Sequence, residues 1–316
     1  MNIIKKIKEK VPNIARDYKQ KRQFLGTAKA TYCSVAIYLG RWGVNKHKYI
    51  SGILKACIPE TLTEFAKING NTLEIISDDC PIWVMWWQGE NAMPPIVRQC
   101  MESIRLHRGK HPVIMLDSKN YTNYIQLPPP ILQKLTTRHW IAQISDIIRF
   151  GLLERYGGIW LDATILVTQD IGAFDTSLYS IRHRQGNPRF VLDGSKWSSF
   201  MFACTKGHPV SAFIHKALIE YFEKHDYLAD YWLTDYVIAI MYTESPTLRK
   251  YIDDLPLDNP TCLALLLERD KPFEKNRFYE IITTNRFNKL DWRIPVLKGT
   301  MLERALNLQT NNKISP

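Results

Sequence analysis

The chain has 316 residues, 45% of them hydrophobic and 23% charged, which is the balance of an ordinary globular protein with room for one large domain or a domain with an appendage. Its 42 Lys and Arg residues exceed its 31 Asp and Glu residues, and the net charge of +11 favours an anionic partner such as a nucleotide diphosphate, an acidic membrane surface or nucleic acid. No basic stripe interleaved with aromatic residues supports nucleic acid, and no apolar run approaches the roughly 20 residues that span a bilayer.

The cysteines and the N-terminal residues indicate the cellular compartment of the protein. Six cysteines are scattered along the chain without a C-x-x-C pair, so neither a zinc cluster nor a disulfide framework is expected. Lysines interrupt the first apolar positions, so we expect no secretory signal peptide. The sequence therefore indicates the reducing cytoplasm.

Residues 1 to about 25 are basic and amphipathic, and Pro12 should kink or divide any helix there. Two interpretations stay open. The segment is either an interfacial helix on the anionic inner face of the cell membrane, or a helix packed on the protein with a solvated basic face. Its apolar positions fall at helical spacing: Ile3, Ile4, Ile7, Val11, Ile14 and Tyr18.

Residues 27 to 80 have mixed helical periodicity and carry no group suited to chemistry. Strand patterns begin only beyond this point. We therefore interpret residues 1–80 as an N-terminal helical extension and residues 81–316 as an α/β domain.

From Pro81 onwards, buried strands alternate with helices. Two strand-helix units precede a third strand after Gly158, which gives the order β-α-β-α-β. Ligands of open α/β sheets bind at the carboxyl ends of strands, so the loop after Trp87 should face a ligand, and Gln88 is its best candidate contact. The sequence lacks G-x-G-x-x-G and a Walker P-loop, which excludes the common dinucleotide and kinase sites. Buried strands are predicted at 81–87 and 112–117, and helices at 94–106 and 131–137.

The stretch from Ser145 to Val167 stands out. It predicts a buried apolar helix, a tight turn at Gly157-Gly158, and a strand buried on both faces that Asp162 interrupts. Asp146 and Arg149 share a face of the helix and should pair with each other or with a polar ligand. A carboxylate within a buried strand is costly unless it binds a metal or a sugar hydroxyl. The structural alternative is a helix ion pair and an acid that caps the next turn.

The pattern S-D-x-x-R-x-x-x-L-x-x-x-G-G-x-x-x-D, from Ser145 to Asp162, resembles the sugar-nucleotide-binding region of GT-A glycosyltransferases with a DXD motif. It is similar to the bacterial capsular polysaccharide synthesis protein family, where an S-D-x-x-R helix leads into Y-G-G-x-W-x-D. The resemblance runs from about Pro81 to about Trp292. It implies a GT-A-like, Rossmann-like domain and a nucleotide-diphosphate sugar as donor.

The resemblance also implies roles for four side chains. Asp146 and Arg149 would hold donor sugar hydroxyls and phosphate or ribose. Asp162 would bind a divalent metal, Mg²⁺ or Mn²⁺, with Thr164 as a further ligand, or would contact the donor directly. Thr164 replaces the usual second acid of the DXD motif and is a poorer ligand for a hard cation, so the need for a metal stays open.

Beyond Val167, residues 175–184 should leave the central sheet, short strands are expected near 189–192 and 197–203, and a helix at 210–223. His208 is expected to be a turn or cap residue, and Ser198 and Ser199 are candidates near the donor sugar.

Asp235 opens a later helix among large apolar neighbours. It is either a first-turn acid favoured by the helix dipole, or a carboxylate that orients or deprotonates the acceptor hydroxyl, as the resemblance favours. Further on, Lys289 would neutralise a diphosphate leaving group and Trp292 would close over it. The alternative is a surface lysine beside a packed Trp.

The sequence thus predicts a cytoplasmic glycosyltransferase, peripheral on the inner face of the cell membrane in one interpretation. It would transfer a sugar, with retention, to a growing capsular or cell-surface polysaccharide or a lipid-linked glycan. The alternative is a non-catalytic glycan- or nucleotide-binding scaffold of the same fold. Its only support is Thr164 in place of the second acid. A nucleic-acid-binding protein rests on charge alone.

Overall fold

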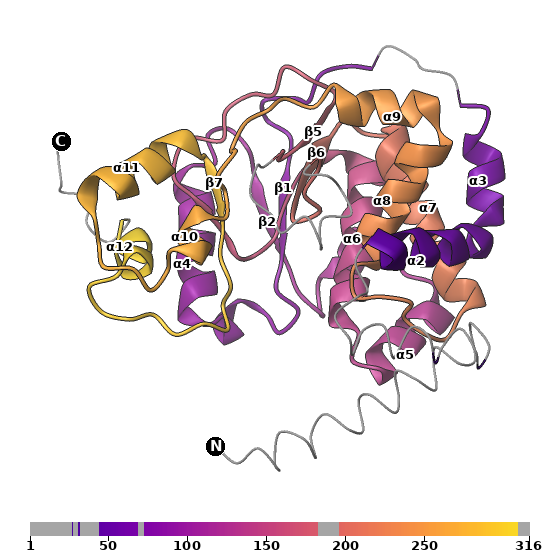
Figure 1. Cartoon of the computed structure of the whole chain (residues 1–316), viewed down its shortest axis with the longest axis horizontal. Coiled ribbons are helices and arrows are strands. Elements are labelled where there is room, and N and C mark those ends of the chain that lie inside the picture. The colour runs from indigo at the N-terminus through magenta and orange to yellow at the C-terminus, as the bar shows by residue number, and fades with distance from the viewer. Residues whose placement is uncertain (1–26, 28–30, 32–43, 69–72, 183–195, 309–316) are drawn as a thin grey trace.

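The computed structural model describes residues 27, 31, 44–68, 73–182 and 196–308, and its centre is a five-stranded sheet of order β2-β1-β3-β6-β5 (Figure 1). Strands β2, β1 and β3 are parallel neighbours, whereas β6 runs antiparallel to both β3 and β5. The predicted mixed α/β class and the first three parallel strands are confirmed. The strands are β1 (Ile82–Met85), β2 (Val113–Leu116), β3 (Gly158–Leu161), β5 (Leu178–Ser180) and β6 (Met201–Cys204).

The two faces of the sheet pack into two different hydrophobic cores. In β1, Trp83 and Met85 point into one core and Ile82 and Val84 into the other. This follows from the alternation of side chains along a strand. It confirms the predictions that β1 is a buried strand and that β3 is buried on both faces. Strand β2 is different, because it lies at the sheet edge and only Leu116 is buried there.

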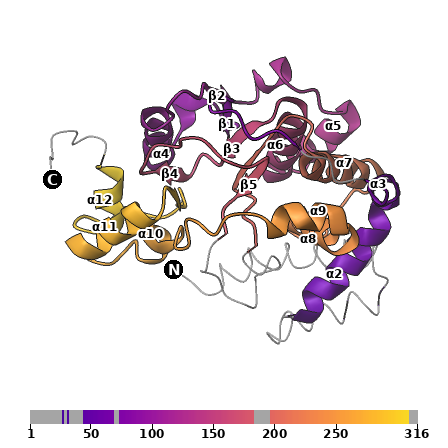
Figure 2. The same ribbon diagram turned by 90° about the horizontal axis from the view of Figure 1, so that it is seen from above.

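Helices cover both faces of the sheet (Figures 1 and 2). The larger core lies between the sheet and α5 (Pro129–Thr137), α6 (Ile141–Tyr156), α7 (Pro209–Lys224) and α8 (Leu233–Glu244). Helix α4 (Pro95–Leu106) packs on the other face. Helix α9 (Pro246–Asp253) follows α8 and packs on it, and short 3₁₀ turns occupy Glu90–Ala92 and Tyr121–Asn123.

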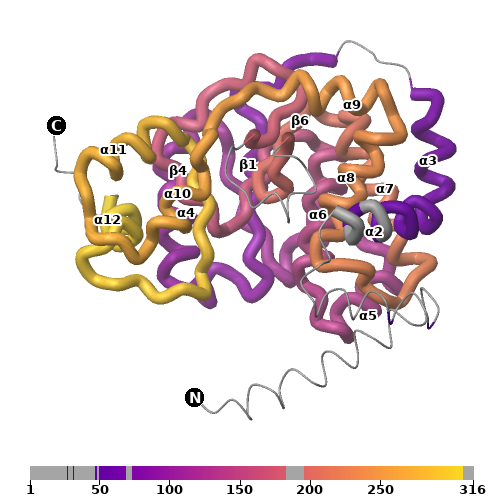
Figure 3. The backbone as a smooth tube through the Cα atoms, in the orientation of Figure 1, coloured from indigo at the N-terminus to yellow at the C-terminus, as the bar shows by residue number. Residues whose placement is uncertain are grey.

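Two described helices precede the sheet, α2 (Val44–Cys57) and α3 (Pro59–Phe65), and they pack on α8 and α7 respectively (Figure 3). Glu220 of α7 accepts hydrogen bonds from the backbone N–H groups of Glu60 and Thr61, at 3.0 and 2.8 Å, which ties the start of α3 to α7. The division at residue 80 stays a prediction, and the predicted helix at 1–25 lies outside the described residues. None of the described helices combines the length and the apolar character needed to cross a bilayer.

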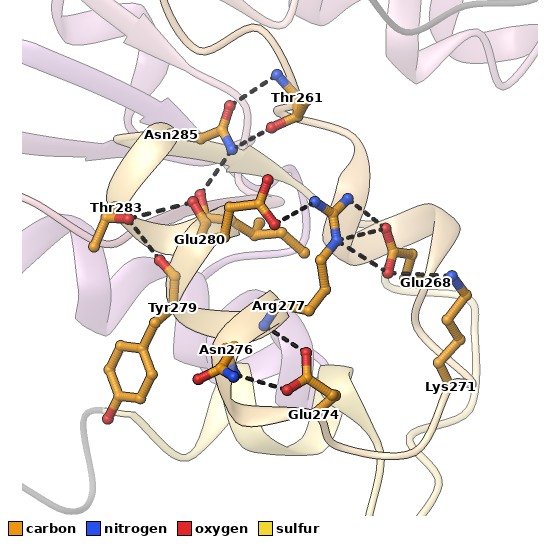
Figure 4. Close-up of polar contacts among 11 residues, drawn as sticks. Thr261, Glu268, Lys271, Glu274, Asn276, Arg277, Tyr279, Glu280, Thr283 and Asn285 are labelled. Carbon is orange, nitrogen blue, oxygen red and sulfur yellow. Dashed lines mark hydrogen bonds and ion pairs between the residues drawn. The ribbon is translucent and has the colours of Figure 1, made fainter.

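The C-terminal part forms a separate layer beside α4 (Figure 1). It contains α10 (Ala264–Leu267), α11 (Lys275–Thr284), β7 (Phe287–Lys289) and α12 (Met301–Leu306). Arg277 of α11 binds Glu268 at 2.7 Å and Glu280 at 2.9 Å, and Glu274 caps the first turn of α11 (Figure 4). Strand β7 pairs antiparallel with β4 (Ile165–Val167) in a two-stranded sheet, which places Lys289 opposite Ile165.

The structure corrects two predictions about the strands. The run through Asp162 is not one strand, because β3 ends at Leu161 and β4 begins at Ile165 in a different sheet. The backbone N–H of Ile165 donates to the carbonyl of Asp162 at 2.9 Å and closes a tight turn between them. Residues 175–184 do not leave the central sheet, since they contain its edge strand β5. The strand predicted at 189–192 lies outside the described residues.

The turn into β3 depends on Gly157 and Gly158, as predicted. Their φ angles are 69° and 101°, a region that L side chains rarely adopt. A Cβ atom on Gly158 would lie 2.4 Å from the carbonyl oxygen of Pro81. The two glycines therefore let helix α6 lead directly into the strand that ends at Asp162.

Candidate functional site

Asp162 lies at the carboxyl end of β3, and its carboxylate accepts three hydrogen bonds. Arg149 Nη2 donates to Oδ1 at 2.9 Å, Trp160 Nε1 donates to the same oxygen at 3.1 Å, and Lys289 Nζ donates to Oδ2 at 2.8 Å. The backbone N–H of Asp162 donates to the carbonyl of Phe200 at 2.9 Å, which fixes the turn against β6. The side chain keeps 26% of its surface exposed, so a ligand can still approach it.

Arg149 is the cation that joins the two predicted carboxylates. Its side chain is 6% exposed, and its guanidinium lies 3.3 Å from Asp146 in addition to its bond with Asp162. Nη1 also donates to the backbone carbonyl of Ser199 at 2.6 Å, and the guanidinium stacks over the ring of Trp160 at 5.0 Å. The predicted pairing of Asp146 with Arg149 is confirmed, and both belong to the helical face that leads to Asp162.

Asp146 and Asp162 differ in their proton affinity. Burial raises the pKa of Asp146, and neither Arg149 nor the hydrogen bond donated by Thr234 at 2.7 Å offsets it. Burial acts in the same direction on Asp162, but Lys289 and Arg149 outweigh it and hold the pKa of that carboxyl below its ordinary value. The surroundings of Asp162 thus favour its ionised form.

Lys289 reaches Asp162 because β7 pairs with β4. Its Nζ donates to Asp162 Oδ2 and to Thr164 Oγ1, at 2.8 Å in each case, and lies 5.2 Å from the ring centre of Phe200. The backbone N–H of Lys289 donates to the carbonyl of Cys262 at 2.8 Å. A residue 127 positions away in sequence is in this way fixed against the predicted site.

Asp235 lies in the first turn of α8 and joins the same network through Ser199. Trp197 Nε1 donates to Asp235 Oδ1 at 3.1 Å, and Ser199 Oγ donates to Oδ2 at 3.4 Å. Since the carbonyl of Ser199 accepts from Arg149, one residue connects Asp235 to the Arg149 group. The structure therefore brings Asp146, Arg149, Asp162, Lys289 and Asp235 into one set of contacts.

Gln88 and Trp292 lie outside this network. Among the described residues, no hydrogen bond or ion pair connects either of them to Asp162. Gln88 is exposed in the turn after β1, and Trp292 is 44% exposed. The ring of Trp292 meets Trp86 at 5.6 Å in an edge-to-face contact, so the β1 turn and the segment after β7 lie side by side.

Comparison with known proteins decides the family. The profile of the family described as "Capsular polysaccharide synthesis protein" matches residues 40–304. The chain belongs to this family. The match includes all five residues of the network, and it begins within the predicted N-terminal extension. No curated protein matches the chain. A solved structure described as "PaToxG Glycosyltransferase" is similar at 14% identity and a TM-score of 0.40, over 76% of this chain and 94% of the other.

In this member of the capsular polysaccharide synthesis family, the residues around Asp162 do not fit the predicted divalent metal. Both carboxylate oxygens already accept hydrogen bonds from cations, and Thr164 is neutral. Within the described ranges, no group of three or more His, Cys, Asp or Glu side chains is placed to hold a metal ion. A metal at Asp162 or Thr164 stays a prediction, and these contacts speak against it.

Three side chains of the family member's network were not predicted: Trp160, Trp197 and Thr234. Each donates one hydrogen bond to a carboxylate that was predicted. Trp160 and Thr234 are near neighbours of Asp162 and Asp235 in sequence, which is the only signal that pointed to them. His208 caps α7, as predicted, because its Nδ1 accepts from the backbone N–H of Val210 at 3.2 Å.

Proposed function

We propose that the chain is a glycosyltransferase that moves a sugar from a nucleotide-diphosphate donor to a growing capsular or cell-surface polysaccharide or a lipid-linked glycan. One observation carries this proposal. The ionised Asp162 lies between Arg149 and Lys289 at the carboxyl end of a parallel strand, within the segment matched to the capsular polysaccharide synthesis family. In open α/β sheets this edge is where ligands bind.

In this proposal the two acids and the two cations contact different parts of the donor. Asp146 and Asp162 accept hydrogen bonds from the sugar or ribose hydroxyls. Arg149 and Lys289 lie where positive charge can meet the diphosphate. Gln88 and Trp292 flank the donor from the β1 turn and the segment after β7. The GT-A arrangement of the domain belongs to this proposal.

The reaction we propose breaks the bond between the anomeric carbon of the sugar and the oxygen of the diphosphate. The electron pair stays on that oxygen, and the nucleotide diphosphate leaves. The acceptor hydroxyl oxygen forms the new bond to the anomeric carbon, with retention, and its proton passes to Asp235. Asp235 is oriented for this by Trp197 and Ser199. Most of the acceleration would come from positioning and from stabilising the charge of the leaving group.

Exposed aromatic rings near the network suit a sugar acceptor. Tyr231 and Trp232 precede α8 and are 63% and 53% exposed. Flat aromatic faces pack on the apolar faces of sugar rings. We propose that the enzyme meets its acceptor on the cytoplasmic face of the cell membrane, where an anionic surface would attract a chain of net charge +11.

Hydrolysis of nucleotide sugars in the absence of an acceptor tests the proposal. The protein should slowly release a nucleotide diphosphate from one sugar nucleotide of a panel, and Asp162→Asn should abolish this release. Asp170→Asn is the matched control, because Asp170 has an 84% exposed side chain paired only with His107 in the described contacts. Full turnover by Asp162→Asn would refute the assignment. Absence of hydrolysis across the panel would favour the non-catalytic scaffold.

A further inference from the structure

Lys289 bridges the two side chains that were expected to share a metal ion. Its Nζ lies 2.8 Å from Asp162 Oδ2 and 2.8 Å from Thr164 Oγ1, the first and third positions of the DXD-like motif. A divalent cation coordinated by these two oxygens would need the space that the ammonium occupies. The position therefore already carries a positive charge that belongs to the chain.

The remaining contacts oppose a second cation there. Asp162 Oδ1 accepts from Arg149 Nη2 and Trp160 Nε1, so the carboxylate has a cation at each oxygen. Mg²⁺ and Mn²⁺ prefer several oxygen ligands, and a neutral Thr164 adds little charge to hold them. A metal ion would have to displace Lys289 and would then lie beside the guanidinium of Arg149, where like charges repel.

Lys289 is also held in place before any ligand binds. It is the last residue of β7, its backbone N–H donates to the carbonyl of Cys262 at 2.8 Å, and the preceding Asn288 is fully buried. Groups on strands are positioned more firmly than groups on loops. An ammonium has three N–H donors, of which Lys289 uses two in the described contacts, and 21% of its side chain is exposed. One N–H group of the ammonium is thus available to donate a hydrogen bond to a phosphate oxygen.

We propose that Lys289 is a built-in cation that replaces the divalent metal toward the diphosphate of the donor, so that donor binding needs no metal ion. The inference rests on the proposed function and specifies its electrostatics. A charge-assisted hydrogen bond from Nζ to a phosphate oxygen would hold the diphosphate, while Asp162 and Thr164 keep the ammonium in position.

Calorimetric titration of the full chain with UDP, GDP, ADP, CDP and dTDP tests the inference without any assay of transfer. One of these nucleotides should bind in excess EDTA, and saturating Mn²⁺ should not tighten its binding. Binding that appears only with Mn²⁺ would overturn the inference and leave the proposed function standing. Absence of binding by every nucleotide under both conditions would overturn the proposed function and the inference with it.

Variants of Lys289 and Thr164 test the same inference on single side chains. Lys289→Met should weaken binding of that nucleotide in EDTA by about tenfold or more, and Lys289→Arg should recover most of the loss. Lys298→Met removes an exposed lysine of the same segment and should bind as the unchanged chain does. The double variant Thr164→Asp with Lys289→Met restores two acids and should bind the nucleotide only with Mn²⁺.

The variants also have an outcome that contradicts the inference. Equal affinity of Lys289→Met and the unchanged chain in EDTA would show that Lys289 does not meet the diphosphate. If Lys289→Met fails to fold by circular dichroism, the comparison of EDTA with Mn²⁺ on the unchanged chain decides the question alone.

Discussion

Replacement of Arg149 by Met tests whether the guanidinium holds the two acids together. Methionine keeps an apolar stem over the ring of Trp160 and removes only the positive charge and the N–H groups of the guanidinium. The carboxylates of Asp146 and Asp162 then lose their shared counter-ion, and the carbonyl of Ser199 loses its donor. We expect a protein that folds with lower stability.

The magnitude follows from the burial of the three groups. Removing one partner of a buried ion pair costs about 3–5 kcal/mol. The side chains of Asp146 and Asp162 are 16% and 26% exposed, and they keep contacts with Thr234 and Lys289, so the lower end applies. Arg149→Met should therefore lower the free energy of unfolding by about 3 kcal/mol near neutral pH.

At acidic pH, the loss of stability caused by Arg149→Met should be smaller. Burial already raises the pKa of Asp146, and loss of Arg149 raises it further. An acid whose pKa is higher in the folded state than in the unfolded state binds protons more tightly when folded, so its contribution to stability improves as pH falls toward the ordinary value. Wild-type Asp162 behaves oppositely, because its lowered pKa contributes stability that disappears as pH falls below the ordinary value.

Urea unfolding followed by circular dichroism, at about pH 7.5 and about pH 5, measures both effects. Arg155→Met is the control, because Arg155 is exposed on the same helix α6 and should change stability by less than about 0.5 kcal/mol. A loss below about 1 kcal/mol for Arg149→Met, or a deficit that widens in acid, would refute the reasoning.

Three further predictions concern stability. Burial lowers the pKa of His208 to about 3, so the chain should lose stability as pH falls from about 6.5, by about 2 kcal/mol at pH 5, because the unfolded state then binds the proton that the folded state rejects. His208→Asn keeps a cap acceptor but does not titrate, so urea midpoints across this range should show a smaller acid sensitivity; equal sensitivity would contradict the idea. Gly158→Ala should cost about 3 kcal/mol in urea unfolding, whereas Gly52→Ala, with open space around it in α2, should be neutral or slightly stabilising; similar effects of the two would contradict the role of the left-handed backbone. Glu220→Gln should cost about 2 kcal/mol, because Glu220 is 5% exposed and accepts the hydrogen bonds at the start of α3, and an unchanged urea midpoint would show that the charge is not needed.

The helix, turn and strand around Asp162 were predictable because they are local. The spacing of Asp146 and Arg149 on one helix face follows from 3.6 residues per turn, and the double glycine marks the turn into β3. These features depend on residues within 17 positions, from 146 to 162, so the pattern of the sequence alone indicates them.

Contacts between distant segments were not predictable in the same way. The apolar residues on both sides of Asp162 fit one long strand as well as two short ones, and only the pairing of β4 with β7 shows that the chain turns there. The same register decides that Lys289 meets Asp162 and Thr164. The hydrogen bond from Trp197 to Asp235 likewise joins the segment before β6 to α8 by packing that no spacing reveals.

The pairing of β4 with β7 also concerns the time at which the site forms during synthesis. Strand β4 leaves the ribosome more than a hundred residues before β7, since Ile165 pairs with Lys289. Until β7 arrives, Arg149 is the only cationic partner of Asp162 among the described residues, and two acids share that one guanidinium. Domains generally fold as units while the chain is made, and the second cation reaches Asp162 only after β7 has emerged. A nascent chain that stops before Phe287 would contain the five strands of the central sheet and both acids and would lack the second cation.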